Sequence, residues 1–264
     1  MAYKYLIYKK DADRHIAYVT INRPERMNAL HPPAHPEFWE VWSDFRDDPE
    51  MWLGILTGAG EKAFSAGNDL RYQAEQAGKN EPRIPSPPGG FGGITNRFDC
   101  FKPMIAAVNG YCLGGGLEMA LACDIIIAAD HARFGLPEPT VGLNAGAGGL
   151  HRLPRQLPLK VAMGMILTAR HITADEAYRI GLVNEVVPLS ELWTCVDSWA
   201  NDILRCAPLS IRSSKEAAMK GQDMTLGVAL NHGFLMSQQM AQSEDFVEGP
   251  KAFSEKRPPD WKGR

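Results

Sequence analysis

Apolar runs alternate with polar segments through the first half of the chain and predict an α/β protein. Five short apolar or alternating runs have the length and composition of β-strands, and polar or glycine-containing turns bound them. The predicted strands cover residues 5–10, 16–21, 52–57, 104–108 and 125–129. Apolar residues at helical spacing predict helices over residues 36–45 and 117–123. Strands that alternate with helices are typical of the α/β class.

The last quarter of the chain has a different pattern, with helix signals and no strand signals. Helices are predicted over residues 208–220 and 225–240, the second from Leu226, Leu230 and Phe234 at a spacing of four. We therefore expect a helical region over residues 206–264, appended to a core over residues 1–205. Its apolar side chains could pack against the body of the same chain or against another subunit, and the pattern favours neither.

Residues 78–93 interrupt the pattern with four prolines and five glycines. Such a composition is incompatible with regular secondary structure. The segment is predicted to be a long surface loop. Two readings remain open for it, a functional lid and a disordered insertion.

Length and charge narrow the classes of protein. The chain has 264 residues, and its 28 Lys and Arg against 31 Asp and Glu give a net charge of −3. This length predicts one large domain, or one domain with a smaller appendage. The near-neutral charge offers no bulk attraction for nucleic acid or an anionic membrane. Every apolar run falls short of the roughly 20 residues that span a bilayer. We therefore expect neither kind of partner.

Cysteine and histidine usage argues against disulfides and metal sites. The five cysteines are odd in number and form no Cys-x-x-Cys pair, which predicts free thiols in a reducing compartment. The N-terminal residues resemble neither a signal peptide nor a transit peptide. The seven histidines are scattered, without an H-E-x-x-H motif. We therefore expect a cytoplasmic protein without a metal.

Two glycine-rich segments that follow predicted strands are candidates for chemistry. Residues 63–70 form a small-residue loop, in which Asp69 could cap a following helix. Residues 109–118 contain three consecutive glycines at the start of a helix. Glycines allow backbone amides to approach a ligand closely, and a helix N-terminus favours negative charge. One amide from each loop could form an oxyanion hole. The alternative is tight strand–helix packing without a ligand.

Two glutamates stand beside these turns. Glu118 lies in the first turn of the apolar helix that follows the glycines, and Glu138 lies between two prolines after a strand. Each has a structural alternative, a favourable helix dipole for Glu118 and an exposed turn for Glu138. As a pair they could share one water molecule. Like charges at that distance raise one pKa and supply both an acid and a base.

Taken together, these segments resemble the crotonase, or enoyl-CoA hydratase/isomerase, family. The resemblance covers nearly the whole chain, with many short motifs in the right order. It rests on residues 21–30, 56–60, 63–70, 102–110, 114–124, 134–155, 181–188 and 243–258. The long Pro/Gly segment and residues 64–67 further resemble the carnitinyl-CoA dehydratase-like branch, which implies an acyl group other than a simple straight chain.

The resemblance implies a spiral of ββα units with a C-terminal helical oligomerisation region that builds trimers, often paired into hexamers. It implies an acyl-CoA thioester as substrate, with coenzyme A as part of the substrate and no other cofactor. The amides of Asn68 and Gly115 correspond to the oxyanion hole. Glu118 and Glu138 correspond to the pair that activates water, with Glu138 as the donor of the Cα proton. Gly146 corresponds to an amide that positions the water.

The same resemblance suggests how coenzyme A is held. Ala66 corresponds to the position whose carbonyl receives the adenine amino group. Lys256 and Phe253 correspond to tail residues near coenzyme A, and Arg26 to a residue near its phosphates.

The presence of both glutamates favours an enoyl-CoA hydratase, a hydro-lyase that adds water to a 2-enoyl-CoA in the syn sense. An enoyl-CoA isomerase, which needs only one carboxylate, is the nearest alternative. A non-catalytic family member that binds coenzyme A or RNA is the third reading.

Overall fold

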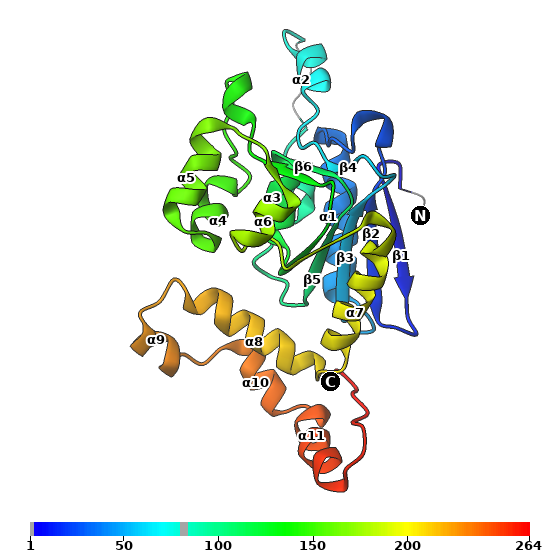
Figure 1. Ribbon diagram of the computed structural model, residues 1–264. Coiled ribbons are helices and arrows are strands. Elements are labelled where there is room, and N and C mark those ends of the chain that lie inside the picture. Colours follow the sequence, from blue (N-terminus) through cyan, green and yellow to red (C-terminus); the bar gives the residue numbers. More distant parts are fainter. Residues whose placement is uncertain (1–2, 80–83) are drawn as a thin grey trace.

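A six-stranded sheet forms the body of the protein in the computed structural model, which describes residues 3–79 and 84–264 (Figure 1). The strands pair in the order β1 (Leu6–Asp11), β2 (Ile16–Ile21), β3 (Leu53–Gly58), β5 (Met104–Val108), β7 (Ile125–Ala129) and β10 (Glu185–Val187). The β1–β2 pair is antiparallel, and the other pairs are parallel. All five predicted strands are present; three of them have the predicted bounds, and the other two are shifted by one residue.

A second, smaller sheet lies at the carboxyl edge of the first and creates a repeated unit. Its strands are β4 (Ala63–Ser65), β6 (Tyr111–Leu113), β8 (Arg133–Gly135) and β9 (Ile172–Thr173). The chain runs from β3 to β4 to α2 (Leu70–Gln76), and then from β5 to β6 to α3 (Gly115–Ala122). Each long strand therefore leads to a short strand and a helix, which confirms the predicted ββα architecture.

Helices cover both faces of the large sheet, and the continuous apolar strands explain why. α1 (His35–Asp47) buries Phe38, Val41, Trp42 and Phe45 against one face. α7 (Leu192–Leu204) covers the other face with Leu192, Val196 and Ala200. All six residues of β3 are buried. A strand buried on both sides reads as an apolar run rather than an alternation.

Further helices follow the short strands and build the side of the body that α3 faces. They are α4 (Gly149–Gln156), α5 (Leu159–Thr168) and α6 (Ala174–Arg179). Short 3-10 helices connect the larger elements, namely η1 (Pro24–Arg26), η2 (Pro32–Ala34), η3 (Phe91–Gly93), η4 (Glu138–Val141) and η5 (Leu189–Glu191). In the described parts of the chain, every helix is too short or too polar to cross a bilayer.

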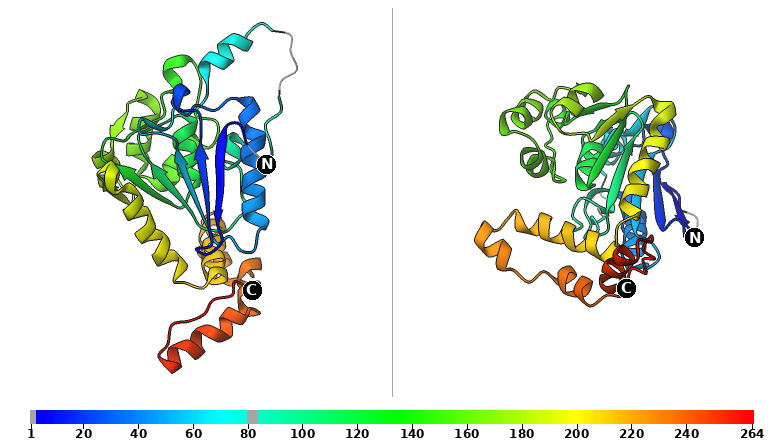
Figure 2. Two further views of the ribbon diagram at one scale, coloured as in Figure 1. Left: turned by 90° about the vertical axis from the view of Figure 1, so that its right-hand side faces the viewer. Right: turned by 60° about the horizontal axis from the view of Figure 1, so that its bottom comes forward.

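The C-terminal helices extend away from the body, below it in Figure 1 and toward the viewer in the right panel of Figure 2. They are α8 (Pro208–Gly221), α9 (Leu226–Asn231), α10 (Leu235–Ala241) and α11 (Glu244–Glu255). The prediction of one helix over residues 225–240 is wrong. The chain becomes extended at His232 and passes through Gly233, a poor helix former, before α10 begins. Leu226, Leu230 and Phe253 are exposed on this region.

The residues after α11 fold back beside it. The Lys262 and Gly263 amides donate to the two carboxylate oxygens of Asp245, at 2.7 and 2.9 Å. Arg257 forms an ion pair with Glu248, and the Trp261 indole donates to the Arg205 carbonyl at the start of the helical region. These bonds hold α11 at a defined position relative to the junction near residue 205. The division into units at residues 205 and 206 stays a prediction.

The Pro/Gly segment is not a surface loop along its whole length. Residues 80–83 lie outside the described residues. Gly89 and residues 92–95 are buried, and η3 contacts α1 and α3. A Cβ atom at Gly92 would lie 2.3 Å from Met119 Sδ, and one at Gly93 would lie 2.5 Å from the Trp39 nitrogen. Glycines therefore let the backbone enter a space that no side chain could share, and the composition alone did not reveal this burial.

Candidate active site

Two glycine loops lie in direct contact at the carboxyl edge of the sheets. One loop follows β4, and the other joins β6 to α3. A Cβ atom at Gly67 would lie 2.7 Å from the Gly115 nitrogen and 2.7 Å from the Leu113 carbonyl oxygen. A Cβ atom at Gly116 would lie 2.2 Å from the Ser65 carbonyl oxygen. Only glycine fits at both positions, because any other residue would push the loops apart.

The Asn68 and Gly115 amides have no acceptor among the described residues. The backbone on either side of Asn68 is engaged by Leu30, whose amide donates to Gly67 at 2.8 Å and whose carbonyl accepts from Asp69 at 2.8 Å. In a parallel bridge of this kind the intervening amide points away from the partner strand. Gly115 begins α3, where the first amides have no partner within the helix. The two predicted oxyanion donors are therefore both available.

The loop after β4 is fixed by side chains on two sides. Asp69 caps α2, as predicted, by accepting from the Tyr72 amide at 3.1 Å, and it forms a buried ion pair with Arg23 at 2.9 Å. The Asn68 side chain donates to Gln73 on α2 at 2.7 Å. This contact directs the Asn68 carboxamide toward α2, the helix that follows it.

Asn28 is a buried connector that the sequence analysis did not identify. Its side chain donates to the carbonyls of Ala59 and Ala63, at 3.0 and 2.7 Å, and accepts from the Arg23 amide at 3.0 Å. Its own carbonyl accepts from the Ser65 hydroxyl at 2.8 Å. It adopts a positive φ of 54°, which asparagine tolerates better than most residues. Asn28 thereby ties the turn after β2 to the loop that carries Asn68.

We expect the change Asn28→Ala to lower the free energy of unfolding by about 2–4 kcal/mol, because it leaves buried groups unpaired at a strained φ. The control is Asn231→Ala, since Asn231 is exposed and makes one hydrogen bond within α9. Urea unfolding of both variants measures the difference. Equal effects of the two changes would contradict the connecting role of Asn28.

Glu118 is buried beside the start of α4. It is 3% exposed, and its Oε1 accepts from the Gly149 amide at 2.8 Å. The pKa of Glu118 is raised to about 7, chiefly by burial and also by the charge of Glu138, against the lowering effects of the Gly149 amide and the charge of Arg152. The carboxyl is therefore balanced between its two protonation states near neutral pH, as general acid–base chemistry requires.

Glu138 lies on the opposite side of the glycine turn. Its Oε1 is 2.8 Å from where a Cβ atom of Gly114 would be, so the glycine makes room for the carboxyl. Its Oε2 is buried and has no hydrogen-bond partner within the described residues. Burial raises the pKa of Glu138. A carboxyl with a raised pKa is protonated more often than a free one at the same pH, and in that form it can give a proton to a bound molecule.

Phe91 forms a wall that the sequence analysis did not predict. Its ring lies 2.6 Å from where a Cβ atom of Gly115 would be and packs against His35, with ring centroids 4.7 Å apart. The Gly92 amide donates to His35 Nδ1 at 3.2 Å, and burial lowers the pKa of His35 to about 4. A neutral His35 and Phe91 thus give the surroundings of the Gly115 amide an apolar side.

Gly146 does not present a free amide, because that amide donates to the Asn144 carbonyl at 2.9 Å. The Gly149 amide contacts Glu118 instead, and it was missed although it stands in the same glycine-rich turn. The role of Gly146 in positioning water stays a prediction.

The predicted coenzyme A residues fall into two groups in the structure. Ala66 lies beside Gly114, and its amide donates to Met27, the residue after Arg26, at 2.9 Å. Ala66 and Arg26 therefore share one edge of the site. Phe253 lies in the last turn of α11 and Lys256 directly follows that helix, and α11 lies at the opposite end of the molecule from α2 in Figure 1 and in the left panel of Figure 2. Within one chain the structure does not bring them to the site, and Phe253 is 88% exposed.

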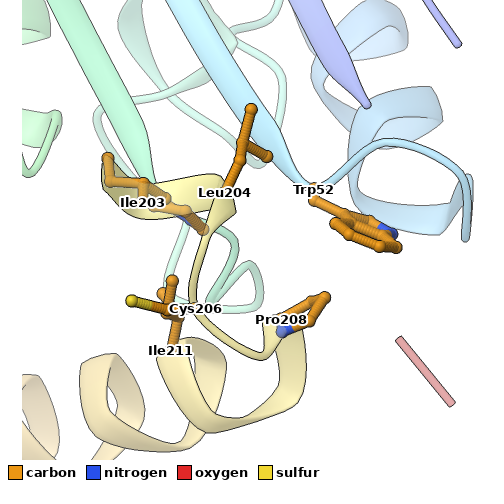
Figure 3. Close-up of a pocket in the computed structure, with 7 residues that line it drawn as sticks. Trp52, Ile203, Leu204, Cys206, Pro208 and Ile211 are labelled. Atoms are coloured by element: carbon orange, nitrogen blue, oxygen red, sulfur yellow. The ribbon is translucent and has the colours of Figure 1, made fainter. Parts of the chain in front are cut away.

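Two surface hollows lie outside the contact between the glycine loops. One is at the junction between α7 and α8, where Trp52 and Cys206 face the hollow with apolar neighbours (Figure 3). The other has a volume of about 160 Å³, and Pro139 of η4, Ala145 and Ile166 are among the residues that line it. In the described parts of the chain, no three metal-ligating side chains gather in one place.

The raised pKa of Glu118 predicts that stability depends on pH. A carboxyl with a higher pKa in the folded state binds more protons there, so its contribution is full below the ordinary value of 4.5 and is lost as pH rises through about 7. We expect Glu118→Gln to be more stable than the wild type at pH 8, by up to about 3 kcal/mol, and little changed at pH 4.5.

Urea unfolding at the two pH values measures this difference. Glu61→Gln, at an exposed position, is the control and should show no such dependence. A pH-independent effect of Glu118→Gln would contradict the burial of its charge.

Known proteins match this chain over almost its whole length. A family profile described as enoyl-CoA hydratase/isomerase matches residues 11–264. The (E)-benzylidenesuccinyl-CoA hydratase of Thauera aromatica is 41% identical over 96% of this chain and 98% of its own length. The carnitinyl-CoA dehydratase of Escherichia coli (strain K12) is 44% identical over 94% of this chain and 95% of its own. The crystal structure of the enoyl-CoA hydratase EchA1 from Mycobacterium marinum is 34% identical, with a TM-score of 0.89, over 98% of this chain and 99% of that one.

Proposed function

The chain belongs to the enoyl-CoA hydratase/isomerase family and is a hydro-lyase of the enoyl-CoA hydratase type, and we propose that Glu118, Glu138 and the Asn68 and Gly115 amides carry its reaction. The observation that carries this assignment is the proximity of the buried Glu118 and the half-buried Glu138 to two amides that have no acceptor among the described residues. One reaction that needs both is the reversible syn addition of water to a 2-enoyl-CoA.

The two amides polarise the thioester. The carbonyl oxygen accepts hydrogen bonds from Asn68 and Gly115, and the N-terminus of α3 adds its positive end. This withdraws electrons from the conjugated double bond and makes Cβ electrophilic. As charge moves onto the oxygen in the transition state, the amides stabilise it without reorganisation.

The two glutamates then divide the elements of water. Glu118, ionised and held by the Gly149 amide, takes a proton from the water whose oxygen bonds to Cβ. Glu138, whose pKa burial raises and whose Oε2 has no partner among the described residues, gives a proton to Cα in its protonated form. The carbon–carbon double bond becomes single, and both new bonds form on the face that the two carboxyls share. Solvent resets the two protonation states.

The acyl group is proposed to be bulkier than a short straight chain. Support comes from the aromatic wall of Phe91 beside Gly115 and from the names of the two relatives, which act on benzylidenesuccinyl-CoA and carnitinyl-CoA. Coenzyme A arrives as part of the substrate, and the proposed reaction needs no other cofactor.

Assembly into trimers or hexamers completes the proposal. Helix α11, which carries Phe253 and leads to Lys256, lies far from β4, which leads to Ala66, so a contact of the α11 residues with coenzyme A at Ala66 requires another subunit (Figure 1). The exposed apolar side chains of α9 and α11 supply a surface for such an assembly. A cytoplasmic location is proposed from the free thiols.

The test follows the ultraviolet absorbance of the conjugated thioester. Purified protein is mixed with straight-chain, aryl-substituted and trimethylammonium-substituted 2-enoyl-CoA esters, and with a 3-enoyl-CoA. Hydration removes the conjugation, so absorbance falls with at least one 2-enoyl ester. A rise with the 3-enoyl ester and no fall with any 2-enoyl ester would establish isomerisation instead. No turnover by the folded protein would favour a binding role.

A further inference from the structure

Arg152 is a half-buried cation that the proposed reaction does not use. It lies on the first turns of α4, and one guanidinium nitrogen donates to the Thr95 carbonyl at 2.7 Å. The other terminal nitrogen packs over Gly148, where a Cβ atom would lie 2.2 Å from it. Burial lowers the pKa of Arg152, and the charge of Glu118 raises it. Burying a guanidinium is unfavourable unless something nearby compensates its charge.

The contacts of Arg152 join the two halves of the site. On one side, α4 presents the Gly149 amide to Glu118, three residues before Arg152. On the other side, the Thr95 hydroxyl accepts from the Phe91 amide at 3.0 Å, and Phe91 packs against Gly115. Arg152 therefore connects the segment that holds the carboxyl with the segment that covers the oxyanion amide.

Two charged groups act most strongly on Glu118. Glu138 from η4 raises its pKa, and Arg152 from α4 lowers it. The buried thiol of Cys123 also faces Arg152, but burial raises its pKa to about 12 and keeps it neutral. Arg152 is thus the positive charge that opposes both burial and Glu138 at this carboxyl.

We propose that Arg152 is a positioning residue that keeps Glu118 ionised and seated on the Gly149 amide while its bond to Thr95 holds the Phe91 wall in place. This inference rests on the proposed function for its effect on turnover. It goes beyond that function in assigning the balance between the two carboxyls to a third side chain. A partner charge of this kind separates the roles of two like groups.

The first test is the pH profile of kcat/KM. Removing an opposite charge near a carboxyl raises its pKa by about one unit or more. For Arg152→Gln this lowers kcat/KM about fivefold at pH 7 and leaves it nearly unchanged at pH 9, because the ionised fraction of the base recovers. Arg152→Lys retains the charge and keeps the midpoint of the wild type.

The control lies on the same helix. Arg155 is exposed and donates to the His151 carbonyl at 2.9 Å, so Arg155→Gln removes an arginine without touching the site. Its profile should overlay that of the wild type. A uniform loss in Arg152→Gln at every pH, with no shift of the midpoint, would overturn the electrostatic role and leave only packing.

A second measurement does not depend on turnover. Carbon NMR of protein labelled at the glutamate carboxyls follows the titration of Glu118, whose signal is identified by its absence in Glu118→Gln. We expect the midpoint to rise by about one pH unit in Arg152→Gln and to stay in place in Arg152→Lys and Arg155→Gln. An unchanged midpoint in Arg152→Gln would refute the inference even if the protein were an active hydratase.

The two measurements also separate this inference from the proposed function. If the Glu118 midpoint shifts in Arg152→Gln but the protein hydrates no enoyl thioester, the role of Arg152 is retained and the proposed reaction is rejected. If Arg152→Gln does not fold, the inference is tested with Arg152→Lys. Because lysine retains the positive charge, a shifted titration midpoint of Glu118 in the folded lysine variant would overturn the inference.

Discussion

Replacing Glu138 or Glu118 with glutamine is expected to lower kcat for hydration by about 10³-fold. Glutamine has nearly the shape of glutamate, and at position 118 it still accepts from the Gly149 amide. It can neither take a proton from water nor give one to Cα. Each variant therefore retains substrate binding and loses proton transfer, so KM should change far less than kcat.

The measurement is the initial rate of absorbance loss with the best 2-enoyl-CoA ester, with folding checked by thermal denaturation. Glu61→Gln is the matched control, since it removes one exposed carboxylate by the same change of side chain. The double variant should be about as slow as the slower single variant, because groups that act together are not additive. Wild-type rates in either single variant would remove that glutamate from the mechanism.

Gly67→Ala is the second change with a large expected effect, a loss of about 10²–10³-fold in kcat. The added methyl group would lie 2.7 Å from the Gly115 nitrogen, so the two loops must separate and both oxyanion donors leave their positions. The backbone adds strain, since Gly67 has a φ of 86°.

A control separates strain from displacement. Gly181 has a φ of 80° and open space around its Cα, so Gly181→Ala carries the backbone penalty of about 1 kcal/mol without a collision. Melting temperature and turnover are measured for both variants. If Gly67→Ala resembled Gly181→Ala in both, the close approach of the loops would not matter for catalysis.

The sequence predicts the fold well where burial alone decides the structure. The strands over residues 104–108 and 125–129 have the predicted bounds because parallel strands covered on both faces read as plain apolar runs. The helix predicted over residues 225–240 fails because one glycine outweighs the apolar spacing around it. Of the three residues at that spacing only Phe234 is buried, whereas Leu226 and Leu230 are exposed, so packing does not support a continuous helix.

The sequence predicts those parts of the candidate site that a single short segment contains. Consecutive glycines mark the Gly115 amide, and two glutamates beside glycine turns mark the carboxyls. The sequence analysis does not identify Phe91 or Arg152, because their importance comes from contacts between segments that are distant in sequence. A phenylalanine in a Pro/Gly segment and an arginine on a polar helix look ordinary until the fold places them.

The proposed oxyanion donors are main-chain amides, whereas the proposed proton-transfer groups are side chains. This difference affects how the site can change during evolution. The groups proposed to polarise the carbonyl are amides, which every residue except proline retains, so the codon for Asn68 can drift without removing the donor. The proposed proton-transfer groups are side chains, and a single nucleotide change in either glutamate codon removes one. A lineage can therefore keep the ability to stabilise an enolate while it gains or loses carboxylates around it. New reactions on acyl thioesters would arise in this scaffold by changing the acids, with the oxyanion site inherited intact.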